Sequence, residues 1–529
     1  MIALSIAVSI SLSRFIEVYD SQSIGWDSAS FLANGAAYAG DTIYNQAFDP
    51  TRPPVIPVIL SLMFRVTGPS ASDGYILSGL LYFLAILGCY FLAREIMNPW
   101  LALLPAASYG LAPMVVEWAG IVYSNVEGTA IAALGLATFS FGIRTKKAWC
   151  LFLTLPLFVI ATLSRYTMGV VIFAAIIYLI TSKSARETLK KQWKHLAGGL
   201  ALASVVFFAL ATYWLGFPSR LGIGLANLFP APQQPNPFQS PRGRAFFAVS
   251  LPAELGIGRY GILMTFVFIA SSAYALVLVY LLAKSSRIGK NKAAIRINQE
   301  SMVRKNEYGV DNENGDETQE RLKLGVDPLV YALLTWFFML FVYYSLIWPY
   351  YDPRYSVEFV MPALILAYWG VSKVLSRIYR LGAEAKTRRF LKVTVTFLVV
   401  ALIVFVFSAE MFASSTAVIE STPVIDSSVS AGFREATGWI KANVPQDAHI
   451  EGDWYTFLQW YLPQYNITAA PVPYQLQTYS QYQSWLSSIA NNGIRYVVYS
   501  DPSAIQIPPE LHPVFTSSVG DVVVFSVGA

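Results

Sequence analysis

Apolar residues occur in long runs along the chain, and short polar segments separate one run from the next. A helix that crosses a bilayer needs roughly 20 apolar residues, fewer where the bilayer is thin, and about eleven runs meet this criterion. The predicted spans are residues 1–17, 75–93, 99–116, 122–142, 148–163, 166–182, 196–216, 259–283, 327–348, 356–374 and 391–412. The run 54–67 is shorter and carries Arg65, so we predict an interfacial helix there.

Lysine and arginine residues orient the spans, because cytoplasmic loops carry an excess of them. Basic segments lie at residues 144–147, 183–194, 284–325 and 373–392. All four are cytoplasmic if the N-terminus is inside and 54–67 does not cross. We therefore expect external loops at 18–74 and 217–258, and a disordered cytoplasmic loop at the highly charged segment 284–325. The predicted location is the plasma membrane, with several passes.

The tail that begins at residue 414 has a different pattern. Helix-like stretches (AGFREATGWIKANV, TFLQWYL, SQYQSWLSSIANNG) alternate with strand-like ones (HIEGD, IRYVVYSD, GDVVVFSV). This alternation is typical of a small α/β domain. The predicted fold class is therefore mainly α, with a polytopic transmembrane domain at 1–413 and a small extracytoplasmic α/β domain at 414–529.

Composition supports a membrane protein and excludes other classes. Hydrophobic residues make up 55% of the chain and charged residues only 13%, against about 25% charged in soluble domains. Cys89 and Cys150 both lie in apolar runs, so no disulfide framework is expected. The net charge of +5 comes from residues beside the spans, so no nucleic-acid partner is indicated. The histidines are scattered without the spacing of metal ligands: they are His195, His449 and His512.

Two acidic residues on the external side are candidates for catalysis. Asp27 follows the first span in an otherwise small and apolar stretch, GWDSASFLANGAAYAG, where a lone carboxylate is unusual unless it is used. Simple solvation at the surface is the alternative. Glu127 stands at the external start of the fourth span, where it could complement the helix dipole while Ser124 or Asn125 caps the helix. Glu117 competes with Glu127 for the same role.

Three external arginines accompany these acids, although the positive-inside rule predicts the opposite. Arg52 precedes two prolines that stiffen the entry to 54–67. Arg165 and Arg354 are each followed by a tyrosine, Tyr166 and Tyr355. A guanidinium beside a hydroxyl can bind phosphate oxygens, whereas snorkelling arginines and an aromatic belt are the alternatives. Together the residues predict an outward-facing site for a phosphate, a lipid tail and a hydroxyl to be activated.

The order of these motifs resembles the GT-C class of membrane glycosyltransferases. It is most similar to the branch of protein O-mannosyltransferases and lipid A aminoarabinose transferases, over about residues 1–412. The resemblance implies that Asp27 is the catalytic acid and Glu127 a second one. It also implies that Arg52, Arg354 and Tyr355 bind the lipid phosphate, and we assign Arg165 and Tyr166 to the same group.

The resemblance implies an inverting transfer of a sugar from a polyprenyl or dolichyl monophosphate. The acceptor is a hydroxyl of a protein, lipid or glycan, and the bilayer is a further partner. No cofactor is certain, and the sequence leaves a divalent metal open, because Thr51 stands where the aminoarabinose branch has an acid. The Trp-Trp-Asp signature of oligosaccharyltransferases is missing from the C-terminal region. A transporter or flippase of lipid-linked sugars is the rival interpretation, although no clear internal repeat supports it.

Overall fold

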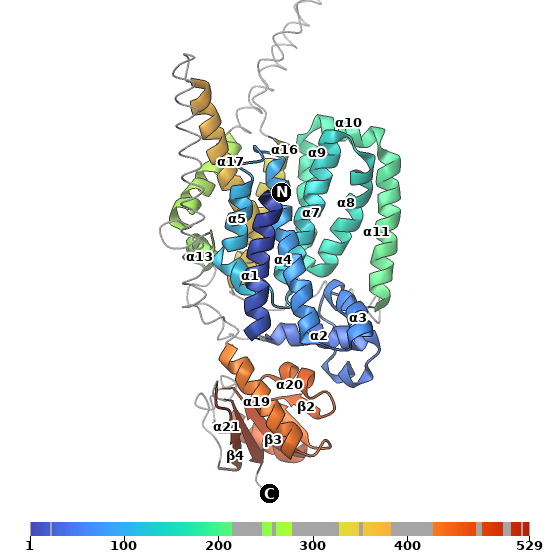
Figure 1. Ribbon diagram of the computed structural model, residues 1–529, viewed down its shortest axis with the longest axis vertical. Helices are drawn as coiled ribbons and strands as arrows, with labels where there is room; N and C mark the ends of the chain where they lie inside the picture. The colour runs from blue at the N-terminus through green and yellow to red at the C-terminus, as the bar shows by residue number, and fades with distance from the viewer. Residues whose placement is uncertain are drawn as a thin grey trace, which may run out of the picture.

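The computed structural model consists of a bundle of long helices with a smaller α/β domain at one end (Figure 1). It describes residues 2–21, 24–213, 246–255, 261–277, 327–348, 353–381, 427–471, 479–500, 509–519 and 522–527. The predicted fold class, mainly α with a small α/β domain, is confirmed. The predicted boundary at 413 and the predicted disordered loop 284–325 lie outside the described residues.

Six helices in the described ranges are long and apolar enough to cross a membrane. They are α1 (Ile2–Ser21), α4 (Ala71–Arg94), α7 (Ser124–Thr145), α11 (Trp193–Tyr213), α16 (Pro328–Val342) with its π-helical continuation η4 (Tyr343–Ile347), and α17 (Val357–Leu381). The chain is therefore a multi-pass membrane protein.

Fewer helices reach spanning length than the sequence predicted, because several predicted spans are short or broken. A proline separates α5 (Leu103–Leu111) from α6 (Pro113–Trp118) within the predicted span 99–116. The 3₁₀ turn η2 (Tyr166–Gly169) and α9 (Val170–Thr181) lead into α10 (Lys183–Lys191), with a bend of 104°. Two further apolar helices are shorter than a full span, namely α8 (Ala148–Ser164) and Gly261–Val277. The predicted span 391–412 lies outside the described residues.

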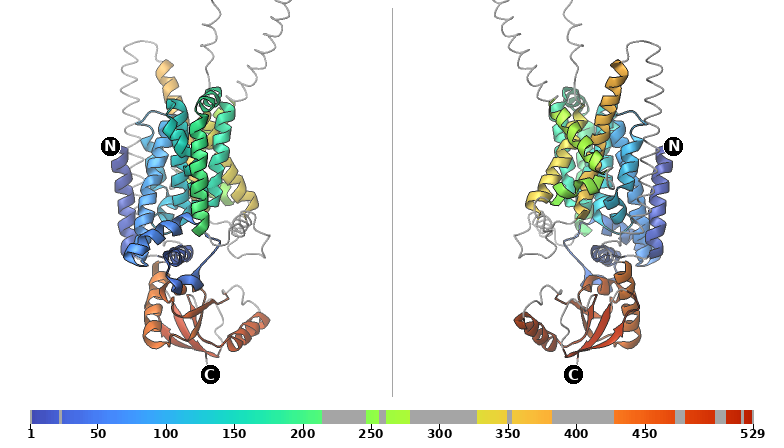
Figure 2. Two further views of the ribbon diagram at one scale, coloured as in Figure 1. Left: turned by 90° about the vertical axis from the view of Figure 1, so that its right-hand side faces the viewer. Right: turned by 90° about the vertical axis from the view of Figure 1, so that its left-hand side faces the viewer.

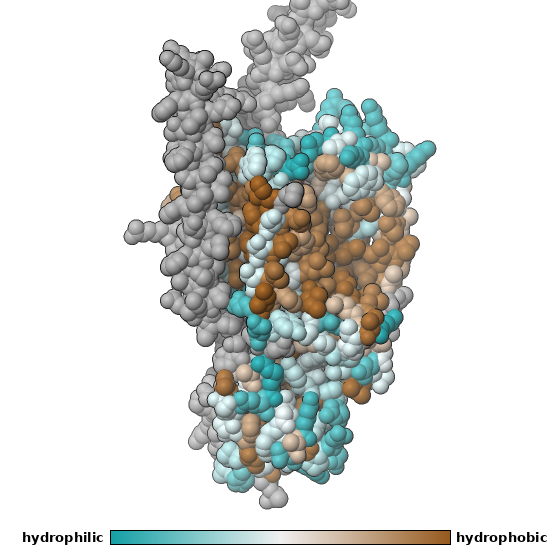
Figure 3. All heavy atoms as spheres, viewed as in Figure 1, coloured by the Kyte–Doolittle hydropathy of each residue, from teal (hydrophilic) through white to brown (hydrophobic). Residues whose placement is uncertain are grey.

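An apolar belt covers the helices on the face shown in Figure 3, with polar residues above and below it. On α1, the exposed side chains include Ile2, Leu12 and Ile16, each about half exposed. Side chains of this kind on an outer helix face are stable in lipid. The basic helix α10 lies at one end of the belt and the α/β domain at the other (Figures 1 and 2).

A layer of short elements covers the end of the bundle that faces the α/β domain. It contains α2 (Trp26–Ala39), the 3₁₀ helix η1 (Thr42–Ala47) and α3 (Val55–Thr67), which the sequence predicted as interfacial. Gly35 of α2 allows a close approach of α3, because a Cβ there would lie 2.8 Å from the Cβ of Leu60. Two further elements complete this region, and they are α13 (Phe246–Leu255) and the 3₁₀ turn η5 (Pro353–Ser356).

The C-terminal domain has a five-stranded sheet in the order β2-β1-β3-β5-β4. The strands β2, β1 and β3 are parallel, whereas β5 pairs antiparallel with both β3 and β4. Their bounds are β1 (His449–Gly452), β2 (Asn466–Ala469), β3 (Ile494–Tyr499), β4 (Leu511–Thr516) and β5 (Val523–Val527). The helices are α19 (Ser427–Asn443), α20 (Tyr455–Tyr461) and α21 (Tyr479–Asn491).

This domain is attached to the covering layer by specific contacts. The amide of Gln46 in η1 donates hydrogen bonds to the carbonyl oxygens of Pro463 and Tyr465, at 2.6 and 2.8 Å. The hydroxyl of Ser430 in α19 donates to the carbonyl of Ile24 at 2.9 Å. The two parts of the chain therefore meet directly at α2 and η1.

Candidate active site

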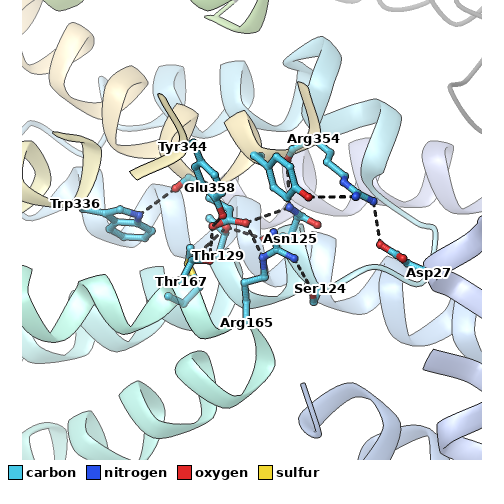
Figure 4. A network of polar contacts seen from close by, with 12 residues as sticks. Asp27, Ser124, Asn125, Thr129, Arg165, Thr167, Trp336, Tyr344, Arg354 and Glu358 are labelled. Carbon is cyan, nitrogen blue, oxygen red and sulfur yellow. Dashed lines mark hydrogen bonds and ion pairs between the residues drawn. The ribbon is translucent and has the colours of Figure 1, made fainter. Parts of the chain in front are cut away.

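The first turn of α2 places Asp27 between two arginines that are distant in sequence (Figure 4 shows Arg354 and Asp27). Its Oδ1 lies 2.7 Å from a terminal nitrogen of Arg52, and its Oδ2 lies 2.9 Å from one of Arg354. The three side chains are only 17–23% exposed. We call Asp27, Arg52 and Arg354 the Asp27 cluster. The predicted convergence of these three residues is therefore observed.

The loop before α3 holds Arg52 in place. Its Nε lies 2.8 Å from the carboxylate of Asp49. Asp49 is itself fixed by Asn34 of α2, which accepts from the Asp49 amide at 2.8 Å and donates to its carbonyl at 2.7 Å. The guanidinium also lies 5.8 Å from the ring centre of Phe31. These contacts make Arg52 a preorganised cation.

Arg354 comes from η5 and lies among aromatic rings. Its guanidinium carbon is 5.8, 5.9 and 5.1 Å from the ring centres of Trp118, Tyr123 and Tyr355. It also donates to the Tyr355 hydroxyl at 3.2 Å. Aromatic faces stabilise a cation and restrict the orientation of its plane.

The charges around Asp27 decide its protonation. Burial raises the pKa of its carboxyl, but Arg52 and Arg354 oppose this, and the net pKa lies below the ordinary value of 3.8. Asp27 is therefore an ionised carboxylate at neutral pH, with both oxygens engaged by guanidinium groups. Any anion that binds these arginines competes with Asp27 for them.

Sequence reasoning missed Glu358, which forms a second cluster beside the first (Figure 4). This residue stands in the first turn of α17 and is completely buried. Four side chains donate to its carboxylate, and we call them with Glu358 the Glu358 cluster: Arg165 at 2.6 Å, Asn125 at 3.1 Å, Thr167 at 2.6 Å and Tyr344 at 2.7 Å. The sequence signal was an acid inside an apolar run, which is rare without a function.

The predicted pair Arg165 and Tyr166 separates in the structure. Arg165 belongs to the Glu358 cluster and also donates to the Ser124 hydroxyl at 3.2 Å. Tyr166 packs instead against the apolar pair Val55 and Leu163, between α3 and α8. The Arg165 guanidinium lies 5.5 Å from the ring centre of Tyr355, so it is linked to the Asp27 cluster through Tyr355.

Glu127 is buried in α7 and interacts with Ser78 of α4. Its Oε2 has no hydrogen-bond partner among the described atoms. The expected alternative that Ser124 or Asn125 caps α7 is wrong, because neither side chain makes a cap hydrogen bond and both point into the Glu358 cluster.

Glu117 lies on α6, where its backbone carbonyl accepts from Arg14 of α1 at 3.0 Å. Within the described ranges, no group of three or more His, Cys, Asp or Glu residues is arranged to hold a metal. The two acids nearest the site, Asp27 and Asp49, are bridged by the positive charge of Arg52, which disfavours a divalent cation between them.

Comparison with known proteins agrees with this architecture. Residues 51–214 match the sequence profile of a family described as dolichyl-phosphate-mannose-protein mannosyltransferase. That range includes Arg52, Glu127 and Arg165, but not Asp27 or Arg354. No curated protein sequence gives a significant match to the chain.

Several crystal structures have the same fold. One is ArnT from Cupriavidus metallidurans bound to undecaprenyl phosphate, with 15% identity, a TM-score of 0.55, and coverage of 98% of this chain and 97% of that one. Another is the oligosaccharyltransferase AglB from Archaeoglobus fulgidus with an inhibitory peptide and a dolichol-phosphate, with 14% identity, a TM-score of 0.50, and coverage of 94% and 69%. The predicted resemblance is confirmed, and the chain has the fold of the GT-C class of membrane glycosyltransferases.

Proposed function

We propose that the protein is an inverting glycosyltransferase that uses a sugar linked to a polyprenyl or dolichyl monophosphate. The acceptor is a hydroxyl of a protein, lipid or glycan on the outer face of the plasma membrane. The observation that carries this proposal is the Asp27 cluster, in which two fixed arginines flank one ionised carboxylate. Arginines suit the phosphate, and the carboxylate suits the hydroxyl.

The pairing of Asp27 gives a reason for donor binding to precede base catalysis. A donor phosphate brings negative charge to Arg52 and Arg354 and weakens their hold on Asp27. A carboxylate that loses cationic partners in a buried site becomes more basic. Asp27 therefore stays a weak base until the donor has bound. Donor binding then makes it basic enough to take the proton of the acceptor hydroxyl.

The reaction then balances simply. Asp27 takes the proton of the acceptor hydroxyl while the acceptor oxygen forms a bond to the anomeric carbon. The bond from that carbon to the phosphate oxygen breaks, and the lipid monophosphate leaves with the electron pair, stabilised by Arg52 and Arg354. Attack from the face opposite the phosphate inverts the anomeric centre.

The remaining predicted residues receive supporting roles in this proposal. Tyr355 contributes its hydroxyl beside Arg354, and Arg165 supports the phosphate site through the Tyr355 ring, whereas Tyr166 lies apart from it between α3 and α8. Glu127, in the first turn of α7, orients the acceptor. The C-terminal domain borders the site as well, since Tyr455 at the start of α20 interacts electrostatically with Asp49 and Arg52.

Basic residues at one end of the bundle support the proposed orientation of the protein in the membrane. The loop at 144–147 and the helix α10 lie at the end opposite the Asp27 cluster, as the positive-inside rule requires if the cluster is external (Figure 1). The charged residues of the site stand at helix ends, at the starts of α2, α7 and α17, which differs from the mid-membrane site of a transporter.

A panel of radiolabelled polyprenyl-phosphate sugars, given to purified protein with peptide, lipid and glycan acceptors, tests the proposal. We expect one donor to yield a glycosidic product with an inverted anomeric centre. The Asp27→Asn variant should form no product. Movement of intact donor across a vesicle membrane without any glycosidic product would instead identify a flippase.

A further inference from the structure

The Glu358 cluster contains the most deeply buried charged group beside the site, and the mechanism above does not use it. We propose that Glu358 is a positioning residue that fixes Arg354 and Tyr355 for the donor phosphate. This inference rests on the proposed function for its link to a donor, whereas the positioning itself is a property of the protein alone.

Glu358 connects three separate segments. Its donors come from the start of α7 (Asn125), the junction of α8 and η2 (Arg165 and Thr167) and η4 (Tyr344). Its own backbone carbonyl accepts from Trp336 of α16 at 3.0 Å. A buried carboxylate with four donors is satisfied only while all these segments keep their places.

Two of these donors also contact the ring of Tyr355. The Tyr344 ring stacks on the Tyr355 ring, with centres 4.9 Å apart and an angle of 16° between the planes. The Arg165 guanidinium lies 5.5 Å from the centre of the same ring. These two neighbours of Tyr355 are thus held by the Glu358 carboxylate.

The connection continues to the Asp27 cluster. Arg354 donates to the Tyr355 hydroxyl at 3.2 Å and to Asp27 at 2.9 Å. A second route is shorter, because Asn125 donates to Glu358 and also to the Arg354 carbonyl at 3.2 Å. The carboxylate of Glu358 therefore restrains both the backbone and the side chain of Arg354.

The negative charge of Glu358 also keeps Arg165 from taking Asp27. The Arg165 guanidinium can only donate, whereas the hydroxyls of Thr167 and Tyr344 can also turn to accept from a glutamine amide at 358. The Glu358→Gln variant removes the charge that holds Arg165, so it should release this guanidinium from the Tyr355 ring and let Arg354 leave its position. The Glu358→Asp variant keeps the charge and should retain part of the restraint.

Phenylglyoxal modifies accessible arginines, and mass spectrometry can follow the rate at which it modifies Arg354 in purified full-length protein. This rate reports how firmly Arg354 is held, without any donor. We expect Arg354 to react several times faster in Glu358→Gln than in the wild type. Thr167→Val and Tyr344→Phe each remove one hydroxyl from Glu358 with little change of shape, so they should give smaller increases. Glu95→Gln is the matched control, because Glu95 pairs with Arg144 at 2.8 Å at the other end of α7.

Binding of undecaprenyl phosphate in nanodiscs adds the functional arm. Glu358→Gln should weaken binding about tenfold, as expected for the loss of a charge-assisted contact. In an Arg354→Ala background, the same change should add little, because both act through one group. Independent, additive losses would indicate general structural damage and overturn the proposal.

The two arms separate this inference from the proposed function. Unchanged labelling of Arg354 in all four Glu358-cluster variants overturns the positioning role, whatever the donor. Faster labelling together with no binding of undecaprenyl phosphate to the wild type would support the positioning role and contradict the proposed donor. If Glu358→Gln does not fold, Thr167→Val and Tyr344→Phe decide the labelling result.

Discussion

Replacement of Asp27 by asparagine should move donor affinity and turnover in opposite directions. In the structure, the carboxylate occupies both arginines that are proposed to bind the phosphate, at 2.7 and 2.9 Å. Asparagine has nearly the same size but no charge, so the arginines lose a competitor and stay in place. The donor then binds without first displacing an anion.

The magnitude follows from the two ion pairs. Hydrogen bonds to charged groups contribute about 1.5–3 kcal/mol each, and partial exposure of these side chains favours the lower end. Recovery of about one such contact for the phosphate, roughly 1.5 kcal/mol at the lower end, corresponds to roughly tenfold tighter binding, since 1.4 kcal/mol is about a factor of ten. Loss of the general base should lower turnover by about 10²–10⁴-fold.

The assay compares undecaprenyl phosphate binding with product formation for the wild type and Asp27→Asn, in the same nanodiscs. Asp447→Asn, a change of the same chemistry at an exposed turn, is the matched control and should alter neither quantity. Weaker binding by Asp27→Asn would refute the competition between carboxylate and phosphate. Retained turnover would refute the role of Asp27 as the base and direct attention to Glu127 and Glu117.

Four further predictions use other parts of the chain. Arg52→Ala should weaken binding of the lipid phosphate by about 1.5–3 kcal/mol without loss of the fold, and wild-type affinity in a titration would contradict its phosphate role. Arg354→Ala should behave likewise, and it should also abolish the tighter binding expected for Asp27→Asn, because the released guanidinium is missing. In intact cells, an impermeant maleimide should label cysteine at 441 and not at 190, in place of the exposed Lys441 and Lys190, and the opposite result would invert the topology. Burial raises the pKa of Asp453 in the C-terminal domain from 3.8 to about 6. Between these two values the folded state binds a proton that the unfolded state has lost, so the free energy of unfolding should fall by about 2 kcal/mol as the pH rises from 4 to 6. Asp453→Asn should flatten this dependence in a denaturant titration at each pH.

Sidedness was the part of the site that the sequence could predict. Arg354 lies about 300 residues after Asp27 and Arg52 in the chain. The Lys/Arg asymmetry nevertheless assigns all three to one face of the membrane. Residues confined to one face of a compact bundle have few places to go, so a shared site follows. Their pairing with one another required coordinates, because the sequence gives no distance between loops.

The orientation of neighbouring residues was beyond the sequence. Arg165 and Tyr166 are adjacent, but Arg165 has extended backbone angles, φ −153° and ψ 115°, between the end of α8 and η2. The two side chains therefore point to different elements. Glu358 was overlooked for a related reason, since its donors come from three segments that are far apart in the chain.

In the C-terminal domain, the longer patterns were predictable and the short edge strands were not. The helices α19, α20 and α21 and the strands β1, β3 and β5 coincide with the predicted stretches. β2 has only four residues, and β4 contains Pro513, which is tolerated at a sheet edge but obscures a strand pattern. Both missed strands lie at the two edges of the sheet.

Burial distinguishes the roles of the two carboxylates that meet the arginines. Glu358 is completely buried, and its four donors leave no room for an exchange of partners. Asp27 is 17% exposed, and in the part of the chain that the structure describes its carboxylate pairs with two guanidinium groups. We therefore expect an incoming phosphate to displace Asp27 from its arginines but not Glu358 from Arg165. In the proposed mechanism, Glu358 stays fixed and holds the site together, whereas Asp27 is released and becomes the base.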